Sequence, residues 1–69
     1  MRIWLKTIRR ERPQGLIAKM AGISQQMYSR IERGDGNPSV EVAKKIATIL
    51  GFDWTLFFDE KQMSKEEAV

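Results

Sequence analysis

The segment "GISQQMYSRIERG", residues 22–34, brings amide, hydroxyl and guanidinium side chains together between two glycines. At about 100° per residue, a helix over this segment would have one apolar side. We expect that side to be buried, and it consists of Ile23, Met27, Tyr28 and Ile31. The opposite side presents Gln25, Gln26, Ser29 and Arg33, with Arg30 at its edge. Glutamine can pair with the N6/N7 edge of adenine and arginine with the O6/N7 edge of guanine, so these side chains have the chemistry to read base pairs.

An ordinary solvated helix is the alternative interpretation of this polar side, because glutamine and arginine are both good helix formers. A solvated helix more often mixes glutamate with lysine. Here the sole carboxylate is Glu32, at the margin of the polar side. This helix alone does not decide between the two interpretations, so the neighbouring elements must.

Composition narrows the class of protein. The chain has 69 residues, of which 42% are apolar, enough for one small domain. It contains no cysteine and no histidine, which excludes a disulfide scaffold and argues against a zinc site. An enzyme would have to rely on carboxylates, lysines or hydroxyls. We therefore expect a binding protein and not an enzyme, with no metal, cofactor or small-molecule ligand.

The sequence contains no membrane or export signal. No apolar run approaches the roughly 18 residues that a membrane span needs. The basic start "MRIWLKTIRRER" lacks the apolar stretch of a signal peptide. These features predict a cytoplasmic protein.

Charge is distributed unevenly along the chain. Residues 1–33 contain eight basic and two acidic residues, a net +6, whereas residues 34–69 contain four basic and seven acidic residues, a net −3. A basic half favours an anionic partner, with nucleic acid the leading candidate. In so short a chain the asymmetry can also arise by chance.

Turn residues separate helix-like patterns at intervals of about ten residues, which predicts an all-α fold of five short helices. The first helix, over residues 2–12, carries Trp4, Leu5 and Ile8 and ends at Pro13. The second covers residues 14–20. Its inner stripe is Ile17, Ala18 and Ala21, with Leu16 and Met20 on an exposed flank and Gly22 as a left-handed terminator.

The third helix begins at Ser24, a good N-cap, and ends at Gly34. After the turn "GDGNPS", Ser39 caps a fourth helix that ends at Gly51. Its predicted core stripe is Val40, Ala43, Ile46, Ala47 and Leu50. Asp53 caps a short fifth helix that carries Trp54, Phe57 and Phe58. Residues 1–58 form the predicted domain, and residues 59–69 a polar tail that is a frayed helix or disordered.

The second and third helices favour the base-reading interpretation. A helix, a short turn that begins at a glycine, and a second helix with polar N-terminal residues form the helix-turn-helix arrangement. Ala18 supplies the small residue needed where two such helices cross closely. One arrangement thus accounts for Ala18, Gly22, the Ser24 cap and the polar side of the third helix.

At this point the sequence resembles the helix-turn-helix proteins of the Cro/phage-repressor type, also called Xre-like. The matching pattern is "Q-x-x-I-A-x-x-A-G-I-S-x-x-x-Y-S-x-I-E-x-G-x-x-N-P-S", from Gln14 to Ser39, and it continues through "KKIATILGF". The resemblance implies a compact five-helix, lambda-repressor-like domain. It also implies a transcriptional regulator, a repressor, that binds double-stranded operator DNA as a homodimer on a two-fold site.

The resemblance also implies roles for individual residues. Gln14 would bind a phosphate and brace the next helix, and Glu32 would pair with an arginine of the first helix. The residues at base-facing and phosphate-facing positions are Ser24, Gln25, Gln26, Ser29 and Arg30, while Arg33 and Asn37 would hold the backbone.

Three positions depart from the family's pattern. The connection "RRERPQ" is about two residues shorter than usual, which leaves Arg9, Arg10 and Arg12 as alternative partners for Glu32. Gly15 stands where the family prefers a charged helix former. Asp35 stands where the family often has a basic residue, and it would repel a phosphate.

Two further hypotheses concern partners. Val42 and Ile49, outside the core stripe of the fourth helix, and Leu56 could join two subunits, or they could pack under the C-terminal tail. The exposed pair Leu16 and Met20 motivates the alternative function, an antitoxin-like or protein-interaction module on the same fold. The operator sequence, the choice between repressor and activator, and the target genes are not readable from the sequence.

Overall fold

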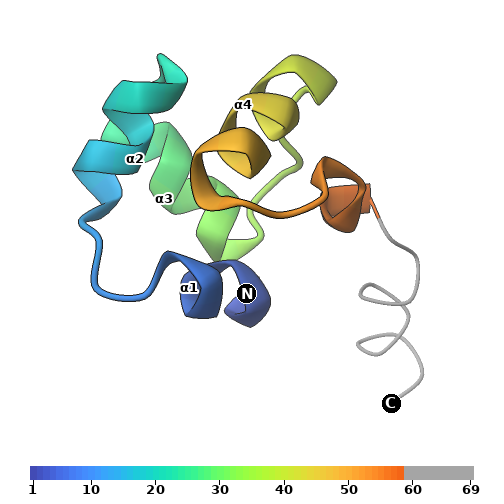
Figure 1. Cartoon of the computed structure of the whole chain (residues 1–69), viewed down its shortest axis with the longest axis horizontal. Helices are drawn as coiled ribbons and strands as arrows, with labels where there is room; N and C mark the ends of the chain where they lie inside the picture. The colour runs from blue at the N-terminus through green and yellow to red at the C-terminus, as the bar shows by residue number, and fades with distance from the viewer. Residues whose placement is uncertain (59–69) are drawn as a thin grey trace.

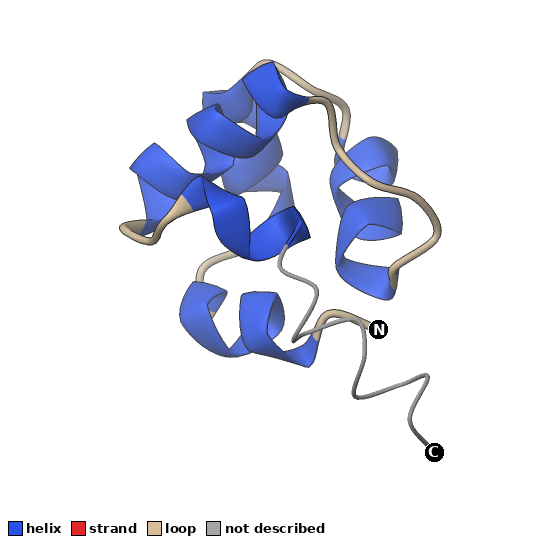
Figure 2. Cartoon of the chain, turned by 90° about the vertical axis from the view of Figure 1, so that its right-hand side faces the viewer, coloured by secondary structure: helices blue, strands red, loops and turns tan. Residues whose placement is uncertain are grey.

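The computed structural model describes residues 1–58, which form helices and loops without a strand (Figures 1 and 2). Four α-helices follow one another, and a short 3-10 helix, η1, completes the described chain. Their bounds are α1 Ile3–Arg9, α2 Gln14–Ala21, α3 Gln25–Arg33, α4 Val40–Leu50 and η1 Trp54–Phe58. The predicted all-α fold is confirmed, and the predicted tail, residues 59–69, lies outside the described residues. None of the described helices is long and apolar enough to cross a membrane.

One core holds these elements together. Every helix contributes to it, and Leu5, Ile17, Tyr28 and Ile46 are its largest fully enclosed side chains. An aromatic cluster joins the two ends of the domain, because the Trp4 ring lies 5.3 Å from that of Phe52 and 5.2 Å from that of Phe57. Edge-to-face contacts of this kind suit the electron distribution of aromatic rings. These rings therefore link the first and last described elements, α1 at the bottom and η1 at the right of Figure 1.

Helices α2 and α3 form the helix-turn-helix. Gly22 ends α2 in the left-handed conformation, with φ 74°, and its N–H donates to the carbonyls of Ala18 and Lys19. Only glycine adopts this backbone without strain. The Ser24 hydroxyl then accepts a hydrogen bond from the Met27 N–H at 3.1 Å and begins α3. Ala18 is buried, as the close crossing of α2 and α3 requires.

Two residues predicted to be buried are exposed instead. Met27 is 49% exposed, because the buried residues of α3 are Tyr28, Ile31 and Glu32. Burial of Glu32 turns the stripe away from Met27, which lies about a quarter turn from its centre at 100° per residue. Val40 is also 49% exposed. It begins α4 and borders a shallow groove beside Trp54 and Phe58.

Two predicted helices differ in length or type. Helix α1 ends at Arg9, three residues before the predicted end, because Arg10 adopts φ 58° and ψ −130°. The fifth helix is a 3-10 helix of five residues and not an α-helix. Asp53 begins it as predicted, since its Oδ1 accepts from the Thr55 N–H at 3.0 Å and from the Thr55 hydroxyl at 2.8 Å.

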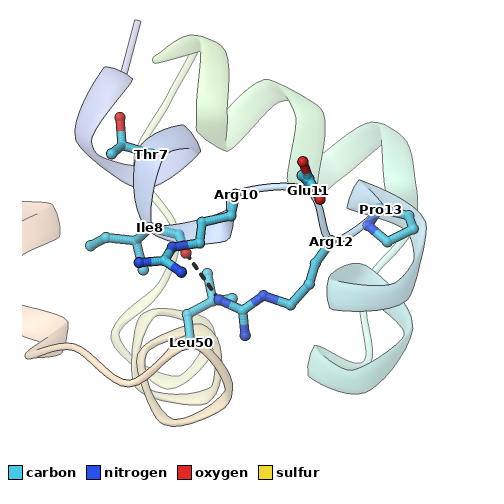
Figure 3. Close-up of a pocket in the computed structure, with 7 residues that line it drawn as sticks. All are labelled: Thr7, Ile8, Arg10, Glu11, Arg12, Pro13 and Leu50. Carbon is cyan, nitrogen blue, oxygen red and sulfur yellow. Dashed lines mark hydrogen bonds between the residues drawn. The ribbon is translucent and has the colours of Figure 1, made fainter.

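The short α1–α2 connection is closed by two arginines. The Arg12 side chain turns back and donates from Nη2 to the Ile8 carbonyl at 2.9 Å (Figure 3). Its Nε donates to the Arg9 carbonyl at 3.1 Å. Arg9 Nη1 in turn donates to the Arg12 carbonyl at 2.6 Å. These bonds satisfy the free carbonyls at the end of α1. They hold Arg10 in a backbone region that costs on the order of 1–3 kcal/mol for a residue other than glycine.

A buried ion pair joins α1 to α3. Arg9 Nε donates to Glu32 Oε2 at 2.5 Å and Arg9 Nη2 to Glu32 Oε1 at 3.2 Å, while Gln14 Nε2 donates to Glu32 Oε1 at 3.0 Å. Glu32 is 4% exposed. Of the three candidate arginines, the partner of Glu32 is therefore Arg9. The Arg10 and Arg12 side chains are exposed.

Burial and hydrogen bonding act in opposite directions on the Glu32 carboxyl. Burial raises its pKa, but hydrogen bonds from Arg9 and Gln14 and the positive charge of Arg9 together lower it below its ordinary value. The same surroundings raise the pKa of Tyr28, chiefly through burial and then through the neighbouring carboxylate. The ionised carboxylate is thus the form that the fold stabilises.

Replacing the carboxylate should destabilise the domain in a pH-dependent way. We expect Glu32→Gln to lower the free energy of unfolding by about 3 kcal/mol at pH 7, because it leaves Arg9 buried without its charge partner. Since the folded pKa of Glu32 is depressed, its contribution is complete above the unfolded value of about 4.3 and is lost as the pH falls through the folded value. Urea denaturation of both proteins between pH 7 and pH 3 measures this difference.

The control for this experiment is the double variant Arg9→Met/Glu32→Leu, which removes both charges and should recover most of the loss. A loss of the same size at every pH would contradict the role assigned to the carboxylate charge.

Candidate nucleic-acid interface

The polar side of α3 borders an open groove of about 630 Å³. The groove is lined by six of the eight residues that the sequence predicted to contact DNA: Gln14, Gln25, Gln26, Ser29, Arg30 and Arg33. Five come from α3 and one from the start of α2. The structure therefore gathers amide, hydroxyl and guanidinium groups from both helices on one surface.

Three of these side chains have no hydrogen bond or ion pair within residues 1–58. They are Gln25, Gln26 and Arg30, and all are exposed. Each carries donors that suit the acceptor atoms of base edges, and the glutamines also carry an acceptor. Their full hydrogen-bonding capacity is thus available to a ligand in the groove.

Arg33 is held at the end of α3 by two neighbours. Its Nε donates to Asp35 Oδ2 at 3.0 Å, and its Nη1 donates to the Ser29 hydroxyl at 3.1 Å. Both members of the Arg33–Asp35 pair are about half exposed, so the pair contributes little to stability. An incoming phosphate would have to compete with Asp35 for the Arg33 guanidinium.

Gln14 occupies the first position of α2 and reaches across to α3. Its amide nitrogen donates to Glu32, which leaves its amide oxygen and one N–H for other partners. The buried network of Glu32 thereby fixes the direction of a side chain that also lines the groove. The bracing part of the predicted role of Gln14 is present in the structure.

The other two predicted contact residues lie outside the groove. The Ser24 hydroxyl is exposed but is used to cap α3. Asn37 lies in the loop between α3 and α4, where its Oδ1 accepts a hydrogen bond from Arg2 Nη2. With this acceptor engaged, the amide N–H groups are the atoms of Asn37 left for an anionic partner.

Arg2, which no sequence motif marks, holds the loop between α3 and α4. Its Nη1 donates to the carbonyls of Ile31 at 2.6 Å and Gly36 at 3.0 Å, and its guanidinium lies 5.6 Å from the Phe57 ring centroid. Arg2 thus ties the α3–α4 loop to α1 and the aromatic cluster. Arg2 contributes to the positive charge of residues 1–33, but no sequence motif distinguishes a residue that holds a loop (the Arg2 clamp) from a surface cation.

The residues proposed for dimerisation are all partly exposed. Val42 and Ile49 lie on α4 and pack against the core with part of their surface, and Leu56 lies on η1. Leu16 and Met20 on α2 are 46% and 58% exposed, as predicted.

Among the described residues, no group of three or more acidic side chains could hold a metal ion.

Comparisons with known proteins agree with this geometry. A family model described as helix-turn-helix matches residues 5–57. The chain is also 47% identical over 75 aligned positions to an uncharacterised HTH-type transcriptional regulator, YqaF, of Bacillus subtilis (strain 168), and the match covers 99% of each chain. No solved structure matches the chain. The protein therefore belongs to the helix-turn-helix family of DNA-binding transcriptional regulators of the Cro/Xre type.

Proposed function

We propose that this protein is a sequence-specific repressor that reads operator DNA with α3 in the major groove. The observation that carries the proposal is the groove at α3, where unpaired glutamine and arginine side chains lie beside Gln14 on one exposed surface. A major groove about 12 Å wide admits an α-helix, and its base edges present the acceptors and donors that these side chains match. The protein acts by binding and not by catalysis.

The proposed contacts to DNA are of two kinds, those that determine the sequence bound and those that hold the backbone. Gln25, Gln26, Ser29 and Arg30 contact base edges or nearby phosphates, and they determine which sequence is bound. Gln14, Ser24, Arg33 and Asn37 contact the sugar-phosphate backbone and set the orientation of α3. The net +6 of residues 1–33 attracts the duplex from a distance and makes affinity fall with salt. The cytoplasm, where such DNA is found, is the proposed location.

A single helix-turn-helix reads few base pairs, so we propose a homodimer on a two-fold operator. Half-site centres would then lie about 34–36 Å apart. The partly exposed residues Val42, Ile49 and Leu56 supply the proposed contact between subunits. A protein bound to an operator can block a promoter. Repression therefore requires only DNA binding from residues 1–58.

A protein-interaction module is the second candidate function. The exposed pair Leu16 and Met20, one turn apart on α2, favours it. Such a module would show almost no binding to random duplex DNA at low salt, whereas the repressor should bind it measurably.

Substitutions on α3 should separate base reading from backbone binding. We expect Gln26→Ala to lower discrimination at particular base pairs by about 1–3 kcal/mol, because a good base contact contributes that much. Arg33→Ala should instead weaken binding to all sequences alike and reduce the salt slope by about one unit. Selection of bound sequences from a random library, followed by salt titration, measures both effects. Intact binding of both variants to the selected site would refute the assignment of α3.

Removing the charge of Asp35 should strengthen binding. We expect Asp35→Asn to raise affinity for duplex DNA of any sequence and to steepen the salt slope, because it removes a repelling carboxylate and frees Arg33. Glu41→Gln is the matched control, since Glu41 is an exposed carboxylate on α4 outside the groove. An equal gain in affinity for both variants would show that net charge is the cause. No gain in affinity for either variant would show that Asp35 does not lie in the interface.

A charged residue on the proposed dimer surface should dissociate the subunits. We expect Ile49→Glu to shift the sedimenting species from dimer to monomer and to weaken operator binding at least tenfold. Thr48→Glu introduces the same charge at the adjacent exposed position of α4 and should leave the dimer intact. Circular dichroism melts check that both variants fold. A wild-type protein that stays monomeric at high concentration, with and without DNA, would contradict the dimer.

A further inference from the structure

We propose that Gly15 is a specificity-determining residue that acts by positioning the Gln25 side chain, an inference that rests on the proposed reading of DNA by α3. Gly15 is the second residue of α2, and Gln25 is the first residue of α3. A β-carbon added at Gly15 would lie 3.1 Å from Gln25 Oε1 and 3.6 Å from Gln25 Cδ. The amide of Gln25 therefore lies closer to this position than a β-carbon ordinarily allows.

The backbone conformation at position 15 does not require glycine. Gly15 lies within the right-handed helix α2, and the positive-φ glycines are Gly22, Gly34, Gly36 and Gly51. In a helix, glycine is less favourable than alanine by roughly 0.5–1 kcal/mol. Its backbone would accept alanine at a gain in stability. Within the described residues, the structural effect of having glycine at position 15 is that it lets Gln25 approach α2 closely.

This contact orients a side chain that is otherwise unrestrained. Gln25 has no hydrogen bond or ion pair within the described chain, so packing against α2 is what limits its rotamers. The first turn of α2 carries free N–H groups and partial positive charge, which favour the amide oxygen on this side. A side chain ordered before binding loses less conformational entropy when it contacts a base.

A methyl group at Gly15 would displace the amide by a few tenths of an ångström. The neighbour in contact is the end of a flexible side chain, so the fold can accommodate the change. The hydrogen bonds of Gln25 to a base are directional, and the displaced amide fits the base edge less well. Discrimination is therefore reduced at the base pair that Gln25 reads, and the rest of α3 stays in place.

The test is Gly15→Ala, examined with and without DNA. We expect its melting temperature to equal or exceed that of the wild type. On a library of operator variants, we expect discrimination to fall about fivefold or more at a single base pair in each half-site, the pair that Gln25→Ala also affects. In a Gln25→Ala background, Gly15→Ala should cause no further change. Thr48→Ala, which raises helix propensity in α4 away from the groove, should leave discrimination unaltered.

A second readout needs no DNA. In ¹H–¹⁵N spectra of the free protein, the Gln25 side-chain amide signals, assigned by their loss in Gln25→Ala, should shift in Gly15→Ala and not in Thr48→Ala. Unchanged amide signals, or unchanged base discrimination by Gly15→Ala, would overturn the inference. If the wild type selects no sequence while the amide signals shift, the proposed function has failed and the specificity role of Gly15 falls with it, although the contact itself stands.

Discussion

The buried carboxylate of Glu32 is the constraint on which the rest of the structure depends. A charge that is 4% exposed is tolerated only when it is paired and hydrogen-bonded, and Arg9 and Gln14 meet this requirement from two other elements. The ion pair therefore fixes how α1, the start of α2 and the end of α3 meet. The Arg2 N–H adds a second link, since it donates to the Glu32 carbonyl at 2.7 Å.

The exposure of α3 follows from the same carboxylate. Because Glu32 takes a place in the core, the buried stripe of α3 consists of Tyr28, Ile31 and Glu32. On the opposite side, Gln26 and Arg30 have no hydrogen bond or ion pair among residues 1–58, and both face the groove. A polar residue in the core thus orients the polar side of α3 outward, and the buried network of the fold also determines which side chains a ligand meets.

Local patterns predicted most of the fold, because helix caps and terminators act within a few residues. Ser24, Gly22 and Asp53 all have the roles that their positions indicated. The predictions that were wrong depend on contacts distant in sequence. Met27 was assigned to the core because the helical wheel treated Glu32 as marginal, whereas the partner that buries Glu32 lies 23 residues away. Six of the candidate site residues named from the family resemblance line one groove, yet neither the Arg2 clamp nor the Gly15 contact has a local signature.

The short α1–α2 connection explains why Arg9, and neither Arg10 nor Arg12, pairs with Glu32. With so few residues between the helices, the chain turns through the strained conformation of Arg10, and Arg12 is used to satisfy the carbonyls at the end of α1. Arg9 alone remains on the side of α1 that faces Glu32. Because Gln14 follows this turn directly, any change in the length of the connection would move a residue of the groove together with the ion pair. In a domain this small, Gln14 belongs both to the buried Glu32 network and to the groove, so a substitution in one affects the other.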